Sequence, residues 1–267
     1  MDATNSGTTT IAAVEDNVTN ASTLSFADDA SDATITSLTV TGTADVSQAT
    51  SIHALIGAGV TAVSYDVEDT ASALLGASTA AISEATSVSV KSGAAGTLTV
   101  SEYDTLLGIT KPNENDGWSY SITDTVENLA GADAAVRDGA VDLSATGTAN
   151  VTQATTIANA INSGTTEIAT LQDTATAIAG SSDAVLDLVT GTVTATDDAT
   201  VSESETLAGF NKAVIYNVEG TVSEVVAALE GVSSARAGID DAVDVSATGI
   251  ADVAQATTVD SATNSGS

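Results

Sequence analysis

The sequence has 267 residues, of which 36 are acidic and 5 are basic, giving a net charge of −31. Nucleic acid requires a basic footprint, so this charge excludes it as a partner and disfavours anionic membranes. Hydrophobic residues make up 43% of the chain but aromatic residues only 3%, which predicts a core of small and β-branched side chains, and the absence of cysteine excludes disulfides and cysteine-ligated metals.

Related segments of two kinds follow one another along the chain. In chain order they are AAVEDNVTNAS (12–22), TVTGTADVSQATSIHALIGAG (39–59), YDVEDTASALLGA (65–77), LTVSEYDTLLGI (98–109), YSITDTVENLAGA (120–132), LSATGTANVTQATTIANAINSG (143–164), ATLQDTATAIAGS (169–181), ATVSESETLAGF (199–210), YNVEGTVSEVVAAL (216–229) and VSATGIADVAQATTVDSATNSG (245–266). Equivalent valines in one kind recur about every 50 residues, and the other kind lies between them. The repeat unit is therefore about 50 residues long and has two half-units of roughly 25 residues.

Each half-unit has the pattern of a strand, a cap and a short helix. Val63, Tyr65 and Val67 alternate with polar residues, which predicts a strand with one buried face. A polar residue then occupies a helix N-cap position, and helical spacing of small apolar residues follows up to a glycine. The predicted caps are Asp16, Asp69, Asp124, Asp173, Ser101 and Ser202, the two serines being paired in capping boxes with Asp104 and Glu205.

A strand–cap–helix unit of this length predicts an α/β solenoid of short parallel strands and short helices. We expect a single elongated repeat domain over residues 1–267, with approximate units 1–34, 35–85, 86–139, 140–188, 189–240 and 241–267, partial at both ends. The valine-bearing segments alternate between two forms, 39–59, 143–164 and 245–266 on the one hand and 98–109 and 199–210 on the other, which gives a superperiod of roughly 100 residues. Immunoglobulin-like β-sandwich domains in tandem have the same size and are the alternative. The alanine- and leucine-rich segments after each cap favour the solenoid.

The residues of an active site are scarce in this sequence. The chain has one histidine, His53, and the aligned copies have Ala158 and Asp260 there, so the position is not a repeated ligand. No nucleophile elbow and no glycine-rich phosphate loop follows a strand. Carboxylates that recur from unit to unit are expected to serve the repeat, and we therefore expect a protein that is not an enzyme.

Clusters of acidic and amide residues suggest one candidate cofactor, calcium, because hard cations prefer carboxylate and carbonyl oxygens. None of the clusters matches an EF-hand loop or a calcium-binding nonapeptide. The NENDG segment can also be a turn insertion. The candidate ligands are Asp28, Asp29, Asp32, Asn113, Asn115, Asp116, Asp197 and Asp198.

The alternation of V-[ST]-x-[AS] with D-T-[AV]-x-x-L segments resembles the repeats of very large secreted or cell-surface bacterial proteins. These are repeat-rich adhesins and S-layer-like proteins of marine bacteria and cyanobacteria, and the resemblance runs from Asn5 to Ser265. It implies a spacer, scaffold or adhesive surface in an extracellular or cell-surface location. Two alternatives stay open: a calcium- or glycan-binding adhesin module, and a phage or virion fibre component.

The two ends of the chain have the same phase of the repeat. Asn5, Ser6 and Gly7 match the Asn-Ser-Gly at 162–164 and again at 264–266, while the first ten residues lack the pattern of a signal peptide. An array cut at this phase has unpaired edges. We therefore expect either further repeats of a longer chain or other copies of this chain as partners, stacked head to tail, besides a glycan or surface receptor.

Overall fold

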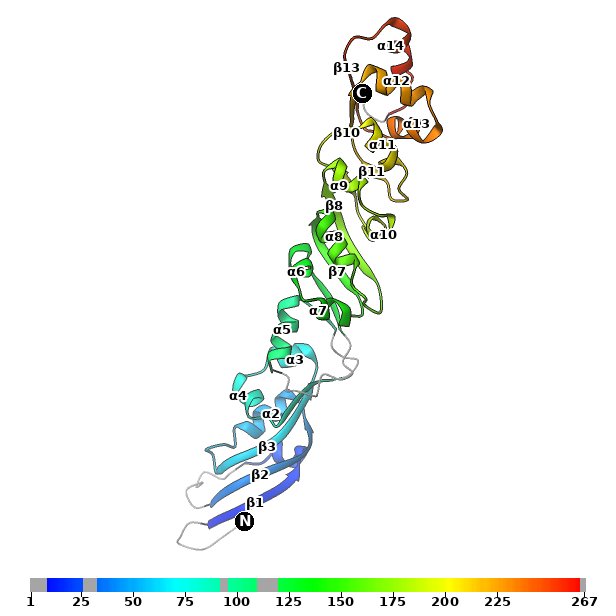
Figure 1. The fold of residues 1–267 in the computed structure, drawn as a ribbon. Coiled ribbons are helices and arrows are strands. Elements are labelled where there is room, and N and C mark those ends of the chain that lie inside the picture. Colours follow the sequence, from blue (N-terminus) through cyan, green and yellow to red (C-terminus); the bar gives the residue numbers. More distant parts are fainter. Residues whose placement is uncertain (1–8, 26–32, 92–95, 110–119, 265–267) are drawn as a thin grey trace. The chain divides into compact units, whose positions relative to one another are not determined.

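The computed structural model describes residues 9–25, 33–91, 96–109 and 120–264. The chain divides into two compact units, Met1–Ser121 and Ile122–Ser267 (Figure 1). The strand pairings within each unit are parallel, and helices connect the strands. The fold is therefore α/β with parallel sheets. No helix in these ranges is both long and apolar enough to cross a membrane.

In the first unit, four strands pair in sequence order, β1-β2-β3-β4. They are β1 (Thr9–Asn17), β2 (Ala33–Ala44), β3 (Val60–Asp69) and β4 (Ser87–Val90). The helices of this unit are α1 (Val18–Ser22), α2 (Val46–His53), α3 (Ala71–Leu75), α4 (Thr79–Ser83) and, after the short strand β5 (Thr97–Leu98), α5 (Val100–Ile109). We use the word coil for one strand, the helices that follow it and the return to the next parallel strand.

The second unit has the same plan, with its strands in two sheets. One sheet has the order β11-β9-β8-β7-β6 and the other β10-β12-β13. The strands are β6 (Ser121–Thr125), β7 (Leu143–Ala149), β8 (Thr166–Asp173), β9 (Val193–Ala195), β10 (Ala199–Thr200), β11 (Val214–Ile215), β12 (Val218–Thr221) and β13 (Val245–Thr248). The helices are α6 (Val126–Gly131), α7 (Ala134–Gly139), α8 (Val151–Ala158), α9 (Ala175–Ala179), α10 (Asp183–Leu186), α11 (Val201–Ala208), α12 (Val222–Glu230), α13 (Ser233–Asp240) and α14 (Val253–Val259).

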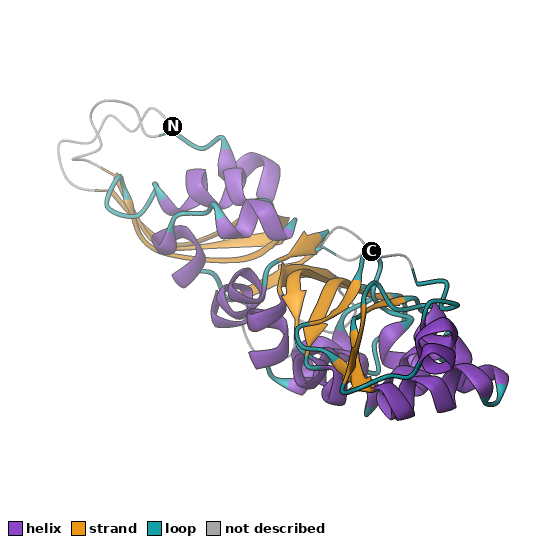
Figure 2. Cartoon of the chain, turned by 90° about the horizontal axis from the view of Figure 1, so that it is seen from above, coloured by secondary structure: helices purple, strands orange, loops and turns teal. Residues whose placement is uncertain are grey.

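The core is built from alternate strand residues and from one side of most helices; Figure 2 shows the helices beside the strands. In β3, Tyr65 and Val67 are buried while Ser64 and Asp66 are exposed, as period-two alternation predicts. The helices add small and branched side chains at equivalent places, among them Leu74, Leu129, Ile157 and Ile178. The core is thus aliphatic, as the composition indicates.

The sequence-based expectation of an α/β fold with parallel strands is confirmed. Immunoglobulin-like sandwiches are antiparallel, so the parallel pairing of the described strands does not fit that alternative. The structure adds a second short helix to several coils, α4, α7, α10 and α13, which the sequence analysis missed. A serine or aspartate two residues after the glycine that ends the first helix, as in Gly76-Ala77-Ser78, was the available signal.

A recurrent glycine kinks the strands. Gly42 and Gly147 have φ values of 85° and 91°, and the pairing register shifts at each of them. Only glycine adopts this left-handed conformation without strain. Gly96 and Gly249 occupy the same place of their repeats and also have positive φ, whereas the equivalent residue of another repeat is Asp197.

Candidate functional site

Threonine and asparagine, not the preceding aspartate, cap the helices that follow the aspartate-bearing strands. Thr70, Thr125 and Thr174 accept hydrogen bonds at Oγ1 from backbone nitrogens three residues later, each at 3.2 Å, and Asn17 caps α1 in the same way. The predicted caps Asp16, Asp69, Asp124 and Asp173 are therefore wrong by one residue. Each precedes the N-cap, because the hydroxyl of the next residue is the one within reach of the free N–H groups.

The carboxylates of Asp69 and Asp173 accept hydrogen bonds from the coil before their own. Asp69 accepts from Thr70 N at Oδ1 (2.7 Å) and from Val46 N at Oδ2 (3.0 Å). Asp173 accepts from Thr174 N (2.8 Å) and from Val151 N (3.0 Å) in the same arrangement. Val46 and Val151 are the first residues of α2 and α8. Each aspartate therefore holds the start of its own helix and caps the helix one coil earlier.

Asp197, a predicted calcium ligand, also caps the helix one coil earlier. Its Oδ1 accepts a hydrogen bond of 2.6 Å from the backbone nitrogen of Ala175, the first residue of α9. Asp198 beside it is exposed. Within the described ranges, no three His, Cys, Asp or Glu side chains come close enough together to hold a metal ion. The other candidate ligands lie outside the described residues: Asp28, Asp29, Asp32, Asn113, Asn115 and Asp116.

The capping boxes also lie elsewhere than predicted. Thr200 Oγ1 accepts from Glu203 N (3.2 Å), and Glu203 Oε2 accepts from Thr200 N (2.8 Å). Thr99 and Glu102 form the equivalent pair before α5. Ser101 and Ser202 are exposed residues of the first helical turn, so their assignment as caps is wrong by two positions.

Glu203 connects neighbouring coils as well. Its Oε1 accepts from the Thr176 hydroxyl of α9 at 2.6 Å. The hydrogen bond from Thr176 and the two from Thr200 lower the pKa of the Glu203 carboxyl, because they stabilise its charged form.

Hydroxyl groups join adjacent strands on the exposed side of the sheets. Ser64 and Thr86 are 3.0 Å apart, as are Thr148 and Thr170. Other threonine hydroxyls donate to carbonyl oxygens one coil earlier, at 3.1 to 3.3 Å: Thr41 to Asp16, Thr146 to Asp124 and Thr248 to Gly220. Threonine thus serves both strand formation and the contact between coils.

Two of the five basic residues complete helix ends. Arg137 is buried and donates from Nη1 to the carbonyl oxygens of Leu129 and Ala132, at the end of α6. Arg236 donates to Leu229 at the end of α12 (3.3 Å) and forms an ion pair with Asp240 (3.0 Å). Cations at helix C-termini satisfy free carbonyls and complement the dipole. These arginines therefore serve the fold.

His53 lies at the last position of α2 and is half-buried. Its Nδ1 atom is buried and has no hydrogen-bond partner among the described residues.

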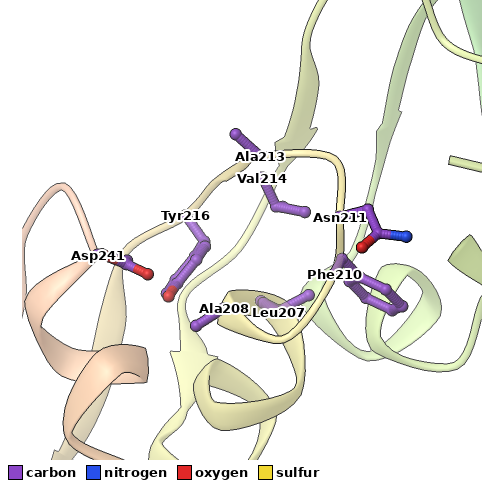
Figure 3. Close-up of a pocket in the computed structure, with 8 residues that line it drawn as sticks. All are labelled: Leu207, Ala208, Phe210, Asn211, Ala213, Val214, Tyr216 and Asp241. Atoms are coloured by element: carbon purple, nitrogen blue, oxygen red, sulfur yellow. The ribbon is translucent and has the colours of Figure 1, made fainter. Parts of the chain in front are cut away.

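An open cavity of about 370 Å³ lies between α11 and β11 (Figure 3). Tyr216 and Asp241 stand on one side of it and Phe210 and Asn211 on the other. The Tyr216 hydroxyl donates to Gly238 O at 3.1 Å, and burial, with a smaller contribution from Asp241, raises its pKa well above the ordinary value. The remaining lining residues are Leu207, Ala208, Ala213 and Val214. The side chains that line the cavity are apolar and polar together, and they include no pair of nucleophile and base.

Comparison with protein-family models, with curated proteins and with solved structures finds no match for this chain. The recurrent aspartates and capping threonines make contacts between or within coils, and the recurrent glycines lie where the pairing register shifts. The hydrogen bonds of these side chains satisfy backbone N–H groups at helix N-termini and connect each coil to the next.

Proposed function

We propose that the chain is a non-enzymatic structural repeat segment, wound as an α/β solenoid, of a secreted or cell-surface bacterial protein. Its role is that of a spacer or scaffold that presents an acidic surface. The observation that carries the proposal is the repeated bond from an aspartate to the helix start one coil earlier, made by Asp69, Asp173 and Asp197.

The bond between coils supports a scaffold because it recurs at the same spacing along the chain. The aspartate and its partner are 22 or 23 positions apart in the sequence, which is one coil. In a solenoid each coil contacts only its neighbours, so stability comes from contacts that repeat at the coil length. A catalytic site, in contrast, is normally made once.

The order of the strands supports the solenoid. In the first unit, consecutive strands are neighbours in one parallel sheet. Each connection between them contains at least one helix. A solenoid repeats this step along its axis. Small core residues such as Ala44, Ala49 and Ala71, all fully buried, permit close stacking of equivalent layers.

The location is proposed from composition and from the resemblance of the repeats. A net charge of −31 keeps a protein soluble and attracts cations. An extracellular protein without cysteine is typical of bacteria, since small secreted eukaryotic modules usually contain disulfides. Spacer, scaffold and adhesive surfaces are the roles that such repeats imply.

Excision of one superperiod tests the proposal. Val46 and Val151 are equivalent residues of the repeat. Removal of residues 47–151 therefore joins Val46 to Thr152 without changing the phase of the repeat. We expect a folded protein with unchanged helix and strand content per residue and a shorter maximum dimension in small-angle X-ray scattering. Removal of residues 47–139 is the control, because it joins the chain about half a coil out of phase and should prevent folding. A scaffold of stacked coils is ruled out if the in-phase variant unfolds or if both variants fold equally well.

A further inference from the structure

The coil formed by β13 and α14 leaves an apolar face uncovered. Helix α14 has no buried residue, whereas its counterparts α2 and α8 bury an alanine and an isoleucine each. Ile250 is 98% exposed and Val253 is 85% exposed. Val46 and Val151, which are equivalent to Val253, are only partly exposed. Nearly the same repeat sequence is therefore shielded from solvent at α2 and α8 but exposed at α14.

The backbone before α14 shows the same difference. Ala44 and Ala149 belong to β2 and β7 and pair with Val67 and Leu171 of the following coil. Both alanines are fully buried. The equivalent Ala251 is exposed, and β13 ends before it, at Thr248. Because the sequence is nearly the same, the difference lies in the absence of a strand beside the far edge of β13 among the described residues.

The coil formed by β1 and α1 has the complementary face. Strand β1 is an edge strand, and its Val14 is only half-buried, while the equivalent Val67 and Leu171 are 0% and 1% exposed. Asp16 stands where Asp69 and Asp173 stand. Its Oδ1 accepts from Asn17 N at 2.8 Å, as in the other copies, but no described residue donates to its Oδ2. This coil belongs to the kind that covers α2 and α8.

We propose that the β13–α14 face of one copy binds the β1–α1 coil of a second copy, head to tail. The inference rests on the proposed repeat scaffold and adds its partner and register. In the complex, Ala251 pairs with Val14 of the second copy, and the Asp16 carboxylate of that copy accepts from Val253 N. The contact reproduces the internal one between α8 and β8. Because it joins two different surfaces, it allows further copies to add.

Charge sets the conditions under which this contact forms. Two copies with a net charge of −31 each repel one another, while the contact itself is made by apolar side chains and backbone groups. Salt screens repulsion between exposed charges but leaves apolar contacts in place. Association is therefore expected to increase as the salt concentration rises from about 0.15 M to about 1 M.

Sedimentation equilibrium over a range of protein and salt concentrations tests the proposal. The chain should have a mass above 26.1 kDa that increases with protein concentration. The double variant Ile250→Lys/Val253→Lys, which changes two exposed side chains and should keep the fold, is expected at 26.1 kDa throughout. Ile161→Lys is the matched control, because Ile161 is also exposed (79%) but lies outside this face. This control should associate like the unchanged chain.

A mixing experiment fixes the direction of the contact. The double variant keeps an intact β1–α1 coil, so an excess of it should cap the unchanged chain and reduce its assemblies to two copies. Three outcomes overturn the proposal: a chain that stays at 26.1 kDa at every salt concentration, a double variant that still associates with itself, or one that does not shorten the assemblies. None of them affects the scaffold proposal, which the excision experiment tests separately.

Discussion

The Oδ2 atom of Asp173 lies 3.0 Å from the backbone nitrogen of Val151, 22 positions earlier in the chain. The bond joins the end of β8 to the first residue of α8, and the other carboxylate oxygen accepts from Thr174. One side chain thus satisfies helix starts in two successive coils. This relationship makes stacking depend on a residue that, in sequence, resembles an ordinary helix cap.

Asp173→Ala removes both bonds and is expected to lower the free energy of unfolding by about 2 kcal/mol. Chemical denaturation measures the change. The exposed Asp187 gives the control, because Asp187→Ala removes the same charge and should alter stability by less than about 0.5 kcal/mol. Equal effects of the two variants would show that charge, and not the bond to Val151, determines the result.

The repeat length, the parallel α/β fold and the position of the first helix of each coil can be predicted from the sequence, because they depend on local periodicity and on polar residues at helix starts. The choice between Asp173 and Thr174 as the cap cannot be predicted in this way. Both residue types cap helices well, and what decides is the helix start one coil away, which local patterns do not contain. The threonine that follows Asp69, Asp124 and Asp173 alike was the available signal. The uncovered face of α14 was likewise not visible, since its sequence matches that of covered helices.

Gly220 occupies the aspartate position of its repeat, yet Gly220→Asp is expected to destabilise the protein. A Cβ atom at Gly220 would lie 2.7 Å from Cγ2 of Val201, the first residue of α11. The strand here approaches the preceding helix more closely than an aspartate allows, and a valine side chain has little rotamer freedom with which to move away. The melting temperature should therefore fall, and it should also fall for Gly220→Ala. An increase for the aspartate variant would show that the repeat pattern outweighs the close contact.

Thr200→Ala and Ser202→Ala distinguish the observed capping box from the predicted one. Thr200 exchanges two hydrogen bonds with Glu203, so its replacement is expected to cost about 1 kcal/mol. Ser202 is exposed within the helix, where alanine has the higher helix propensity, and its replacement should change stability by less than about 0.5 kcal/mol. Denaturation of both variants under the same conditions checks this, and the reverse order of the two effects would contradict the assignment.

Gly147→Ala and Gly108→Ala are expected to have opposite signs. Gly147 has a φ of 91° at the bulge of β7, where a side chain costs about 1–2 kcal/mol. Gly108 lies in α5, and a Cβ atom there would meet open space, so alanine should stabilise the helix by up to about 1 kcal/mol. Thermal unfolding of the two variants measures both. If Gly147→Ala were neutral, the bulge would tolerate a change of backbone conformation.

Tyr65 makes the stability of the first unit sensitive to alkaline pH. Its hydroxyl donates to Ala81 O, and burial, followed by the charge of Glu84, raises its pKa from 10.0 to about 12. Because the folded pKa is the higher one, the unfolded chain loses its proton first. The stabilisation is therefore complete below pH 10 and declines as the pH rises from 10 to about 12.

Tyr65→Phe removes this ionisation together with the hydrogen bond. The variant is expected to be less stable than the unchanged chain at pH 8, by about 1 kcal/mol for the lost bond, and to lose less stability above pH 10. The two melting curves should therefore converge as the pH approaches 12. Melting temperatures measured at half-unit pH intervals check this, because the two proteins differ only at residue 65. A constant difference between the two proteins from pH 8 to pH 11.5 would show that Tyr65 ionises alike in the folded and unfolded chain.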